Sequence, residues 1–420
     1  MMSLLDEIRD LAREVGDDVE GFVRRTAKKL FEEAAEHPQH VFAVLRAVSP
    51  ILVAHGFAIV TRYDDVVEVL EHDEAFSVSP YTAKMRAVAG DFILGMDDSP
   101  EYERDVSILR LAAPRTDPPA LAAYVYEQAE ALVSEAGGRI DVVDLAARVP
   151  ARVMARWFGT PGPDERAIVD WTLALFAEIF LNLQGDEDIT RRASEVAPSM
   201  REHLDEVIRR RKSSGTRSDD VLGRLIAMQE VPDTALTDEQ IRTNFVGLIV
   251  GFIPTVMTST TYAFDALLDR PDALAGAREA ALTDDDDGLR TYVWEAMRLN
   301  PQAPGLIRRA STDYVLAEGT RRAKRIPAGT LTFAATQSAM LDGDVVDDPG
   351  DFRTDRPAHD YLHFGTGLHE CFGRFMNEVQ IPLILKPLLR RRGLRRAEGD
   401  DGKLARTLQY PTRLVVEYDT

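Results

Sequence analysis

Cys371 is the only cysteine among the 420 residues, and it lies in a glycine-rich loop. The loop reads Phe-Gly-Thr-Gly-Leu-His-Glu-Cys-Phe-Gly from Phe364 to Gly373. Gly365 and Gly367 permit the positive φ angles of a tight turn that directs amide N–H groups at the sulfur, and Gly373 lets the chain pass close to a flat ligand. A helix that begins near Cys371 adds its positive dipole end, which favours a thiolate over a thiol. These are conditions for an axial sulfur ligand on haem iron.

Two other interpretations of this loop are weaker. A glycine-rich turn before a helix can simply bury an inert cysteine. A phosphate-binding loop would need Gly-Lys-Ser/Thr or a dinucleotide fingerprint after a strand, and the sequence has neither. The pattern Phe-Gly-x-Gly-x-His-x-Cys-x-Gly in one window is far more specific, and with it the segment resembles the haem-ligand loop of the cytochrome P-450 family, the haem-thiolate monooxygenases. The resemblance implies haem b as cofactor, Cys371 as its metal ligand, and Phe364, Gly365 and Gly373 in contact with the haem.

Two further motifs agree with this family in order and spacing. The segment Glu295-Ala-Met-Arg298 is similar to the family's Glu-x-x-Arg helix, and the segment from Phe352 to Arg356 is similar to the one whose arginine completes an ion network. Residues three apart share a helix face and can form an ion pair. Inside an apolar helix each charge needs a partner, and the resemblance gives Arg356 that role. We therefore interpret Glu295, Arg298 and Arg356 as structural and not catalytic.

Haem carries two propionates, which need hydrogen-bond donors. By motif position the resemblance assigns them to His369, two residues before the cysteine, and to Arg308, with Arg309 as the alternative. In the family a third donor often comes from a helix near residue 100. There the usual histidine position holds Tyr102, and we expect Tyr102, together with Arg104, to serve instead.

The helix expected over the other face of the haem departs from the family pattern, which is Ala/Gly-Gly-x-Asp/Glu-Thr. Gly251 fits, but Ile253 stands at the acid position, Pro254 stands at the alcohol position, and Thr255 comes one residue late. Splitting dioxygen requires protons delivered through hydroxyls, carboxylates and ordered water. Ile253 cannot relay a proton, and Pro254 removes a helix N–H, which predicts a kink and a free carbonyl near Val250. Thr255 is therefore the catalytic candidate on this helix.

Three functions are compatible with these residues. The first, favoured because most of the family works this way, is a monooxygenase that inserts one oxygen atom into a small or medium apolar organic substrate. The second is a peroxygenase or hydroperoxide isomerase, which receives its oxygen already reduced and needs no electron donor; Pro254 resembles such members. The third is a non-catalytic haem-binding sensor. Substrate contacts are expected from variable segments that include Phe176, Phe180 and Leu183, although helical spacing makes these equally typical of a core.

The elements that position these residues are mostly helical, and the expected fold class is mostly α (α+β) with a small β-sheet region. Thr237 begins a capping box, Thr-x-x-Gln, ahead of a long apolar helix that we place at 237–268. The whole chain, 1–420, is predicted to be one haem domain. Its other expected parts are N-terminal helices over 1–50, helices from 118 to 211 interrupted near 159–163 and at 185, sheet pieces at 57–61, 306–335 and 413–418, the ligand loop at 361–374, and a helix kinked or broken near Pro382.

Charge and composition limit the partners. A formal net charge of −20 argues against binding to nucleic acid or to an anionic membrane surface. The acidic residues near the N-terminus leave no signal-peptide core, and the weakly charged run from Asn244 to Ala263 is better explained as a buried helix than as a membrane span. A single cysteine fits a reducing cytoplasm. We therefore expect a cytoplasmic protein, and a monomer.

Basic residues gather near the cysteine in spite of the acidic total. An acidic ferredoxin or flavodoxin can dock on such a patch by electrostatic steering. The same arginines can equally serve to keep a C-terminal helix soluble. The residues concerned are Arg374, Lys386, Arg390, Arg391, Arg392, Arg395 and Arg396.

Overall fold

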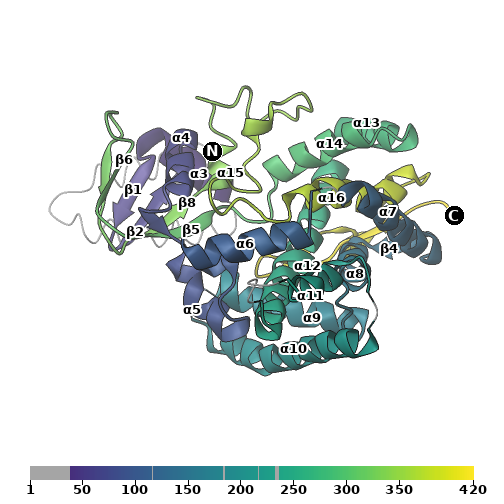
Figure 1. Ribbon diagram of the computed structural model, residues 1–420. Helices are drawn as coiled ribbons and strands as arrows, with labels where there is room; N and C mark the ends of the chain where they lie inside the picture. Colours follow the sequence, from purple (N-terminus) through teal and green to yellow (C-terminus); the bar gives the residue numbers. More distant parts are fainter. Residues whose placement is uncertain (1–37, 116, 183–184, 216, 232–235) are drawn as a thin grey trace. The chain divides into compact units, whose positions relative to one another are not determined.

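The computed structural model describes residues 38–115, 117–182, 185–215, 217–231 and 236–420 (Figure 1). These residues form two compact units. Unit 1 consists of the described residues up to Phe76 together with Pro304–Pro349, and unit 2 consists of Ser77–Ala303 together with Gly350–Thr420. The helices expected before residue 38 lie outside the described residues.

Unit 1 is built on a five-stranded sheet with the order β1-β2-β8-β5-β3. β1 and β2 form an antiparallel hairpin, β2 and β8 run parallel, and β8 pairs with β5 antiparallel. The predicted piece at 57–61 and the first and last strands of the piece at 306–335, β5 and β8, are therefore members of one sheet, while β6 and β7 form a separate antiparallel pair. The elements of this unit are α3 (Pro38–Val48), β1 (Ile51–Ala54), β2 (Phe57–Val60), α4 (Tyr63–Glu71), β3 (Phe76–Ser77, at the boundary), β5 (Leu306–Ala310), β6 (Tyr314–Leu316), β7 (Lys324–Ile326), β8 (Leu331–Ala334) and α15 (Thr336–Ala339).

Unit 2 is mostly helical, and a long helix runs through its core. α12 packs against α8, α9, α10, α14 and α16, and Figure 1 shows it among them. The helices are α5 (Ser79–Val88), η1 (Ile93–Gly95), α6 (Pro100–Ala112), α7 (Pro118–Glu135), α8 (Val142–Val153), η2 (Met154–Phe158), α9 (Glu165–Phe176), η3 (Ala177–Leu181), α10 (Glu187–Ser214), α11 (Val221–Met228), α12 (Asp238–Leu268), α13 (Pro271–Leu282), α14 (Asp286–Leu299), η4 (Ala358–Asp360), α16 (Arg374–Arg390) and η5 (Gly399–Gly402).

Two small sheets complete unit 2. β4 (Arg139–Asp141) pairs with β12 (Val415–Glu417), which also pairs with β9 (Arg395–Arg396), while β10 (Ala405–Thr407) and β11 (Tyr410–Arg413) form a hairpin. The predicted interruptions are present: Gly159 ends η2 with φ 73°, and Gly185, also at φ 73°, precedes α10. The prediction missed β4, which follows two further glycines with positive φ, Gly137 and Gly138.

The bounds of α12 agree with the capping box. The Thr237 hydroxyl accepts from the Gln240 amide, and the Gln240 side chain accepts from the Thr237 N–H in return. Among the described helices α12 alone is long and apolar enough to cross a membrane, and 83% of its most apolar stretch is buried inside the protein. Such burial is typical of the core helix of a globular unit, as the sequence predicted.

The long helices α12 and α16 are continuous across their internal prolines. α12 continues through Pro254, and α16 continues through Pro382 and Pro387, so the break expected near Pro382 is not there. A proline removes one backbone hydrogen bond from a helix. Every residue of α16 from Gln380 to Leu389 is buried, chiefly against α7 and α13, and this packing holds the helix together across both prolines.

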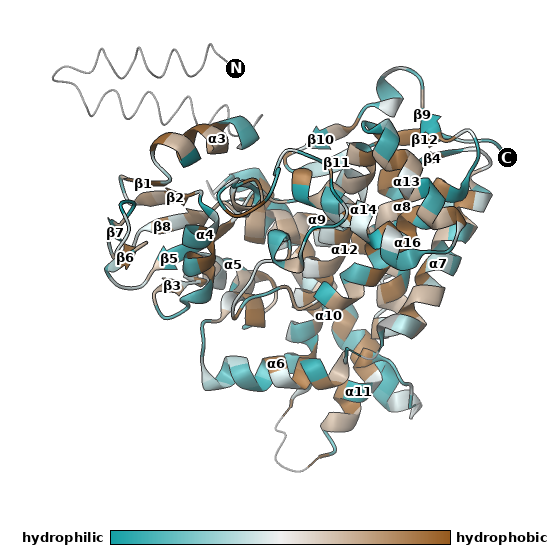
Figure 2. Cartoon of the chain, turned by 90° about the horizontal axis from the view of Figure 1, so that it is seen from above, coloured by the Kyte–Doolittle hydropathy of each residue, from teal (hydrophilic) through white to brown (hydrophobic). Residues whose placement is uncertain are grey.

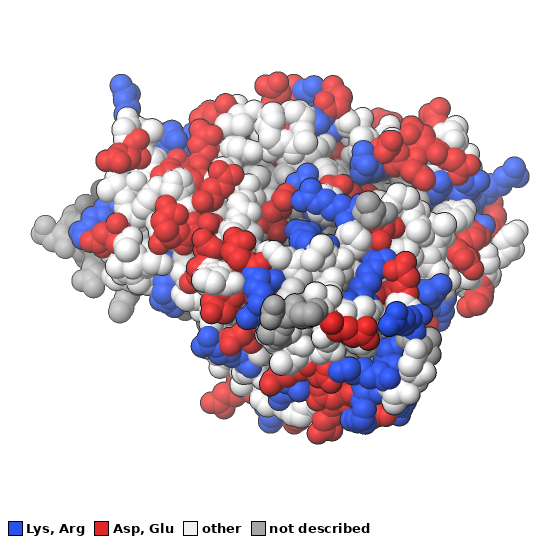
Figure 3. All heavy atoms as spheres, viewed as in Figure 1, with Lys and Arg blue, Asp and Glu red and all other residues white. Residues whose placement is uncertain are grey.

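Hydropathy changes along single helices, and charges of both signs are mixed on the surface. α6 is hydrophilic over its first turns and more hydrophobic towards its end (Figure 2). On the face shown in Figure 3, acidic and basic side chains are interspersed. The net charge of −20 is therefore not concentrated in one acidic field on that face.

Candidate functional site

The loop before α16 folds back on itself, which brings the backbone of Cys371 next to that of Phe364 at the start of the loop. The Cys371 N–H donates to the Phe364 carbonyl at 2.9 Å. Gly365 and Gly367 adopt φ angles of 68° and 76°, a region that favours glycine. α16 begins at Arg374, so the sulfur lies just before a helix N-terminus, as the sequence predicted.

Without a bound metal ion, the environment of the Cys371 sulfur favours the protonated thiol over the thiolate. Burial raises the pKa of the Cys371 thiol to about 11, while the Gly373 N–H acts in the opposite direction by stabilising the thiolate. A bound cation inverts this balance, because a coordinating thiol loses its proton outright. Among the described residues no group of three His, Cys, Asp or Glu side chains could hold a bare metal ion. A lone thiolate therefore fits a metal whose other ligands come from a macrocycle, as in haem.

Two glycines leave room beside this sulfur and on α12. Gly373 has an ordinary φ of −83°, and a β-carbon there would meet only the Asn377 Nδ2 atom at 3.6 Å and the Cys371 Sγ atom at 4.0 Å. A β-carbon on Gly251 would meet only a methyl group of Leu94, at 3.9 Å. Neither glycine has a positive φ, and the open space beside each fits the flat ligand that the sequence predicts.

Aromatic rings pack behind the loop. The Trp294 ring lies 5.8 Å from the Phe364 ring and 5.1 Å from His363, and the His363 and Phe364 rings are 4.6 Å apart. Burial lowers the pKa of His363 to about 3, so this imidazole is neutral. The sequence reasoning missed His363 and Trp294, and we interpret both as support for Phe364.

His369 and Tyr102 meet at one cavity in unit 2. The Tyr102 hydroxyl donates to the Leu368 carbonyl at 2.8 Å, and its ring lies edge-on to the His369 ring at 5.5 Å. The cavity has a volume of about 220 Å³, and its lining residues are Ile93, Leu94, Tyr102, Glu103, Val106, Arg110, Leu368, His369, Glu370 and Phe372. The structure thus brings His369 and Tyr102 together beside the ligand loop, but the one O–H hydrogen of Tyr102 is already donated to the Leu368 carbonyl. The propionate roles of both residues stay predictions.

A third donor in this cavity is Arg110, which the sequence reasoning missed. Its Nη1 atom donates to the Phe372 carbonyl at 3.0 Å, and its guanidinium lies 4.1 Å from the centre of the Phe372 ring. The expected helper, Arg104, instead forms an ion pair with Asp105 at 2.8 Å. The signal was in the sequence, because Tyr102, Val106 and Arg110 are spaced by four and so share one face of α6.

Arg308 belongs to unit 1, on β5. It is buried, and its Nη1 atom donates to the Ile307 carbonyl at 3.0 Å. Arg309 is more exposed and donates to the Gly329 carbonyl at 3.0 Å. The propionate role of Arg308 stays a prediction.

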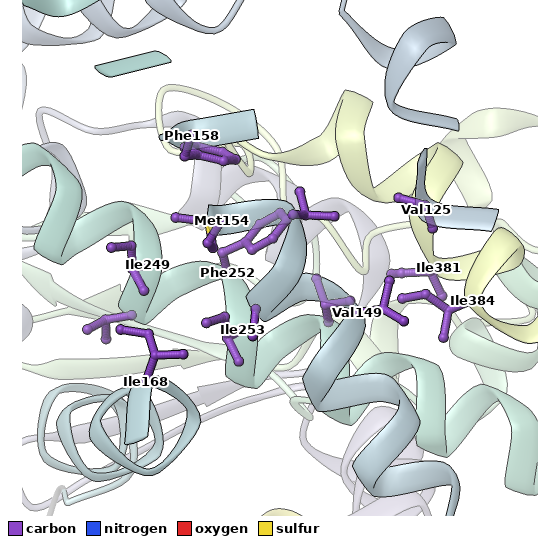
Figure 4. Close-up of a cluster of buried hydrophobic side chains, with 14 of the residues drawn as sticks. Val125, Val149, Met154, Phe158, Ile168, Ile249, Phe252, Ile253, Ile381 and Ile384 are labelled. Carbon is purple, nitrogen blue, oxygen red and sulfur yellow. The ribbon is translucent and has the colours of Figure 1, made fainter. Parts of the chain in front are cut away.

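The middle of α12 exposes one narrow face, which carries Leu248, Gly251 and Thr255. The Thr255 hydroxyl donates to the Gly251 carbonyl at 2.7 Å and approaches the Phe252 carbonyl at 3.1 Å. Ile253 and Pro254 are buried on other sides of the helix, and Figure 4 shows Ile253 within the hydrophobic core. Although Thr255 comes one residue after the alcohol position of the family pattern, its hydroxyl still contacts Gly251. This face of α12 carries no carboxylate.

The structure joins Glu295, Arg298 and Arg356 in a buried ion network. Glu295 Oε1 accepts from Arg298 Nη2 at 2.7 Å and from Arg356 Nε at 2.9 Å, while Oε2 accepts from Arg298 Nε at 2.8 Å. The Arg353 N–H also donates to Oε1, at 3.1 Å. All three charged side chains are at most 1% exposed. The network ties α14 to the segment that leads into the ligand loop.

The basic residues near the cysteine are largely neutralised. Carboxylates pair with Arg374, Lys386, Arg390, Arg391, Arg395 and Arg396. Lys386, for example, is buried and bonded to Asp286 at 2.6 Å. This arrangement favours the second of the two interpretations, in which these residues serve the structure of the helix end.

The aromatic residues expected at a substrate pocket form a cluster. The Phe176 and Phe180 rings are 4.6 Å apart, and the Tyr81 ring lies 5.4 Å from Phe180. Leu183 lies outside the described residues. The cluster joins η3 to α5.

The described part of the chain is mostly helical, and its glycine turn places the partly buried Cys371 sulfur next to the open space at Gly373. The family model described as cytochrome P450 matches residues 170–407, more than half of the chain. The chain belongs to the cytochrome P450 family.

Relatives agree over most of the chain. It is 27% identical to erythromycin C-12 hydroxylase of Saccharopolyspora erythraea over 356 residues, 83% of this chain and 85% of that protein. It is 28% identical to nocardicin C N-oxygenase of Nocardia uniformis subsp. tsuyamanensis over 369 residues, 83% and 87% of the two chains. The crystal structure of CalO2 superposes with a TM-score of 0.78 at 22% identity, covering 92% of this chain and 97% of that one.

These comparisons confirm four predictions. They are the family, the mostly α (α+β) fold, haem b as the cofactor, and the function as a monooxygenase, an oxidoreductase enzyme. The roles of single residues are not tested by them and are taken up next.

Proposed function

We propose that the chain is a haem-thiolate monooxygenase that inserts one oxygen atom into a small or medium apolar organic substrate, with Cys371 as the axial ligand. The observation that carries the proposal is the single, partly buried sulfur of the glycine turn, with the Gly373 N–H acting on it and the open space beside Gly373. Bound there, haem supplies the activation of dioxygen, one atom of which goes to the substrate and the other to water with two electrons and two protons.

Residues of the ligand loop and of α6 shape the cofactor site. Gly365 and Gly367 shape the turn, Arg110 anchors the peptide after the sulfur, and Tyr102 holds the Leu368 carbonyl. These contacts fix the loop before any ligand binds, which is the preorganisation that a metal site needs. His369 supplies one propionate donor, and the prediction for Arg308 is kept.

Thr255 is the proton-handling residue of the exposed face of α12. Because its hydroxyl hydrogen is directed at the Gly251 carbonyl at 2.7 Å, its oxygen lone pairs are free to accept a proton donor such as water. A rotation of the hydroxyl then passes a proton onward. No carboxylate on this face assists it, so ordered water has to connect Thr255 to solvent.

The proposal includes an electron donor, a cellular location and an oligomeric state. We expect a ferredoxin or flavodoxin-type donor, a cytoplasmic location and a monomer. Besides the C-terminal arginines, Arg110 and Arg115 pack against the start of α16, where their guanidinium groups lie 4.1 and 3.9 Å from the Phe372 and Phe375 rings. An acidic donor docking there should bind more weakly as salt is raised.

The absorption spectrum of the reduced, carbon-monoxide-bound protein tests the proposal. A Soret band at the thiolate position is expected for the wild type. Cys371→Ser should lose that band and keep its helical circular dichroism. A well-folded, haem-loaded wild type without the thiolate band would exclude Cys371 as the ligand.

A second candidate function rests on one observation. Ile253 and Pro254 are buried, so the exposed face of α12 offers Thr255 and no acid. A peroxygenase or hydroperoxide isomerase needs less proton delivery and no electron donor. Turnover with hydrogen peroxide or a lipid hydroperoxide, without reductase, at a rate that Thr255→Val leaves unchanged would favour this function; turnover only with reductase, reduced by the same variant, would favour the first.

A further inference from the structure

Arg110 lies on α6 and contacts the residue that follows Cys371 in the chain. Its Nη1 atom donates to the Phe372 carbonyl at 3.0 Å, and its guanidinium lies 4.1 Å from the centre of the Phe372 ring. The hydrogen bond and the ring contact together fix the position of the guanidinium. A positive charge is therefore held one residue away from the sulfur ligand.

No carboxylate pairs with this cation. Among the residues that the structure describes, Arg110 forms no ion pair, and its hydrogen bond goes to a neutral carbonyl. Burial lowers the pKa of Arg110 and the nearby charge of Arg115 lowers it further, while Cys371 and Glu370 act in the opposite direction. A guanidinium stays protonated even so. Because a partly buried charge without a partner is costly, the position of Arg110 calls for an anion.

The ionic side chains at the start of α16 leave one negative charge uncompensated. Glu370 pairs with Arg374, and Arg374 also pairs with Glu378 at 2.8 Å, so one cation serves two carboxylates. When a metal displaces the proton of Cys371, the thiolate adds a second negative charge. Arg110 lines the same cavity as Glu370 and supplies a compensating cation.

These charges act on the sulfur itself. Besides burial and the Gly373 N–H, the groups that change the pKa of the Cys371 thiol are Glu370, which raises it, and Arg110 and Arg374, which lower it. Reduction of a metal centre adds one negative charge to it, so a nearby cation favours the reduced state and a nearby anion favours the oxidised state. The effect is larger where water is partly excluded than at an exposed side chain, where salt screens it.

We propose that Arg110 is a positioning residue whose cation, held against Phe372, compensates the Cys371 thiolate and raises the reduction potential of the haem, whereas Glu370 lowers it. The proposal rests on Cys371 as the axial ligand. It gives Arg110 a role beyond that of an anchor for the loop, because an anchor needs a hydrogen-bond donor and not a charge.

Spectroelectrochemical titration of the haem-loaded protein, without substrate or donor protein, tests this inference. Arg110→Met removes the charge and should make the potential more negative, with a roughly tenfold change in the ferric–ferrous equilibrium, which is about 59 mV for one electron. Glu370→Gln should shift the potential by a similar amount in the positive direction, and the double variant should return towards the wild-type value. Arg110→Lys keeps the charge and should stay close to the wild type.

Arg115→Gln is the matched control. Arg115 is exposed, and its guanidinium lies 3.9 Å from the centre of the Phe375 ring, four residues beyond Cys371. Solvent and salt screen such a charge, so its removal should shift the potential much less than Arg110→Met does. An equal shift in the two variants would show that the position of Arg110 on Phe372 has no special effect.

The outcomes are separable. Shifts of the same sign in Arg110→Met and Glu370→Gln, or equal shifts in Arg110→Met and Arg110→Lys, would overturn the inference, since neither follows the charge. Lower haem content at an unchanged potential would also overturn it and would assign Arg110 to a propionate. If Arg110→Met does not bind haem, Glu370→Gln decides, and the absence of a positive shift overturns the inference. Failure of Cys371 as ligand is recognised separately, because the wild type then lacks the thiolate spectrum.

Discussion

Glu295→Gln is the substitution for which the structure gives the clearest expected cost. Glu295 receives two hydrogen bonds from Arg298, one from Arg356 and one from the Arg353 N–H, all between 2.7 and 3.1 Å. Glutamine keeps the shape, removes the carboxylate that the two buried guanidinium groups share, and places an NH₂ group against an arginine donor. Breaking a buried ion pair by neutralising one partner costs about 3–5 kcal/mol, so we expect a loss of that size in the free energy of unfolding.

Urea unfolding followed by circular dichroism measures this loss, and Arg191→Gln provides the control. Arg191 pairs with Asp188 at 2.6 Å, but the two side chains are 64% and 87% exposed, and exposed pairs contribute at most about 1 kcal/mol. The two variants should therefore differ by at least about 2 kcal/mol. Equal and small losses would show that the network is not the tie between α14 and the ligand loop described above.

Three further predictions follow from single contacts. Arg110→Met leaves the carbonyl after Cys371 without its donor and should destabilise the loop by about 1–3 kcal/mol, seen as loss of the thiolate band at a lower temperature than in the wild type. Gly373→Ala should leave the fold and its melting temperature intact, because its φ of −83° suits alanine, yet lower haem content measured after reconstitution; full loading would contradict the need for open space. Burial, with a hydrogen bond to Glu68, raises the pKa of Tyr314 to about 12 from 10. The protonated phenol therefore stabilises the folded state below pH 10, and this contribution is lost as the pH rises to about 12. Tyr314→Phe should flatten the fall in the free energy of unfolding over this range, and identical pH profiles for variant and wild type would refute this cause.

Much of the fold is local enough to be predicted from the sequence. The capping box at Thr237 places the start of α12, and Gly159 and Gly185 mark ends of helices because their left-handed φ angles interrupt the helix. The loop from Phe364 to Gly373 is equally local, since its turn and its sulfur lie within ten residues. In each case neighbours in sequence supply the physical cause.

The remainder depends on partners distant in sequence. Pro382 predicts a break that packing against α7 and α13 prevents. Arg110 becomes a loop anchor only because α6 meets Phe372, 262 positions away. Arg104, the helper expected beside Tyr102, instead forms an ion pair with its neighbour Asp105.

The sheet of unit 1 has a consequence for synthesis of the chain. β2 (Phe57–Val60) pairs in parallel with β8 (Leu331–Ala334), so its second edge stays unpaired until about 270 further residues have been made, which takes about 15–55 s at roughly 5–20 residues per second. During that time the hairpin of β1 and β2 exposes an apolar strand edge, which is a template for association with other chains. A chaperone that covers the nascent hairpin should therefore raise the yield of this protein more than one that acts on the finished chain.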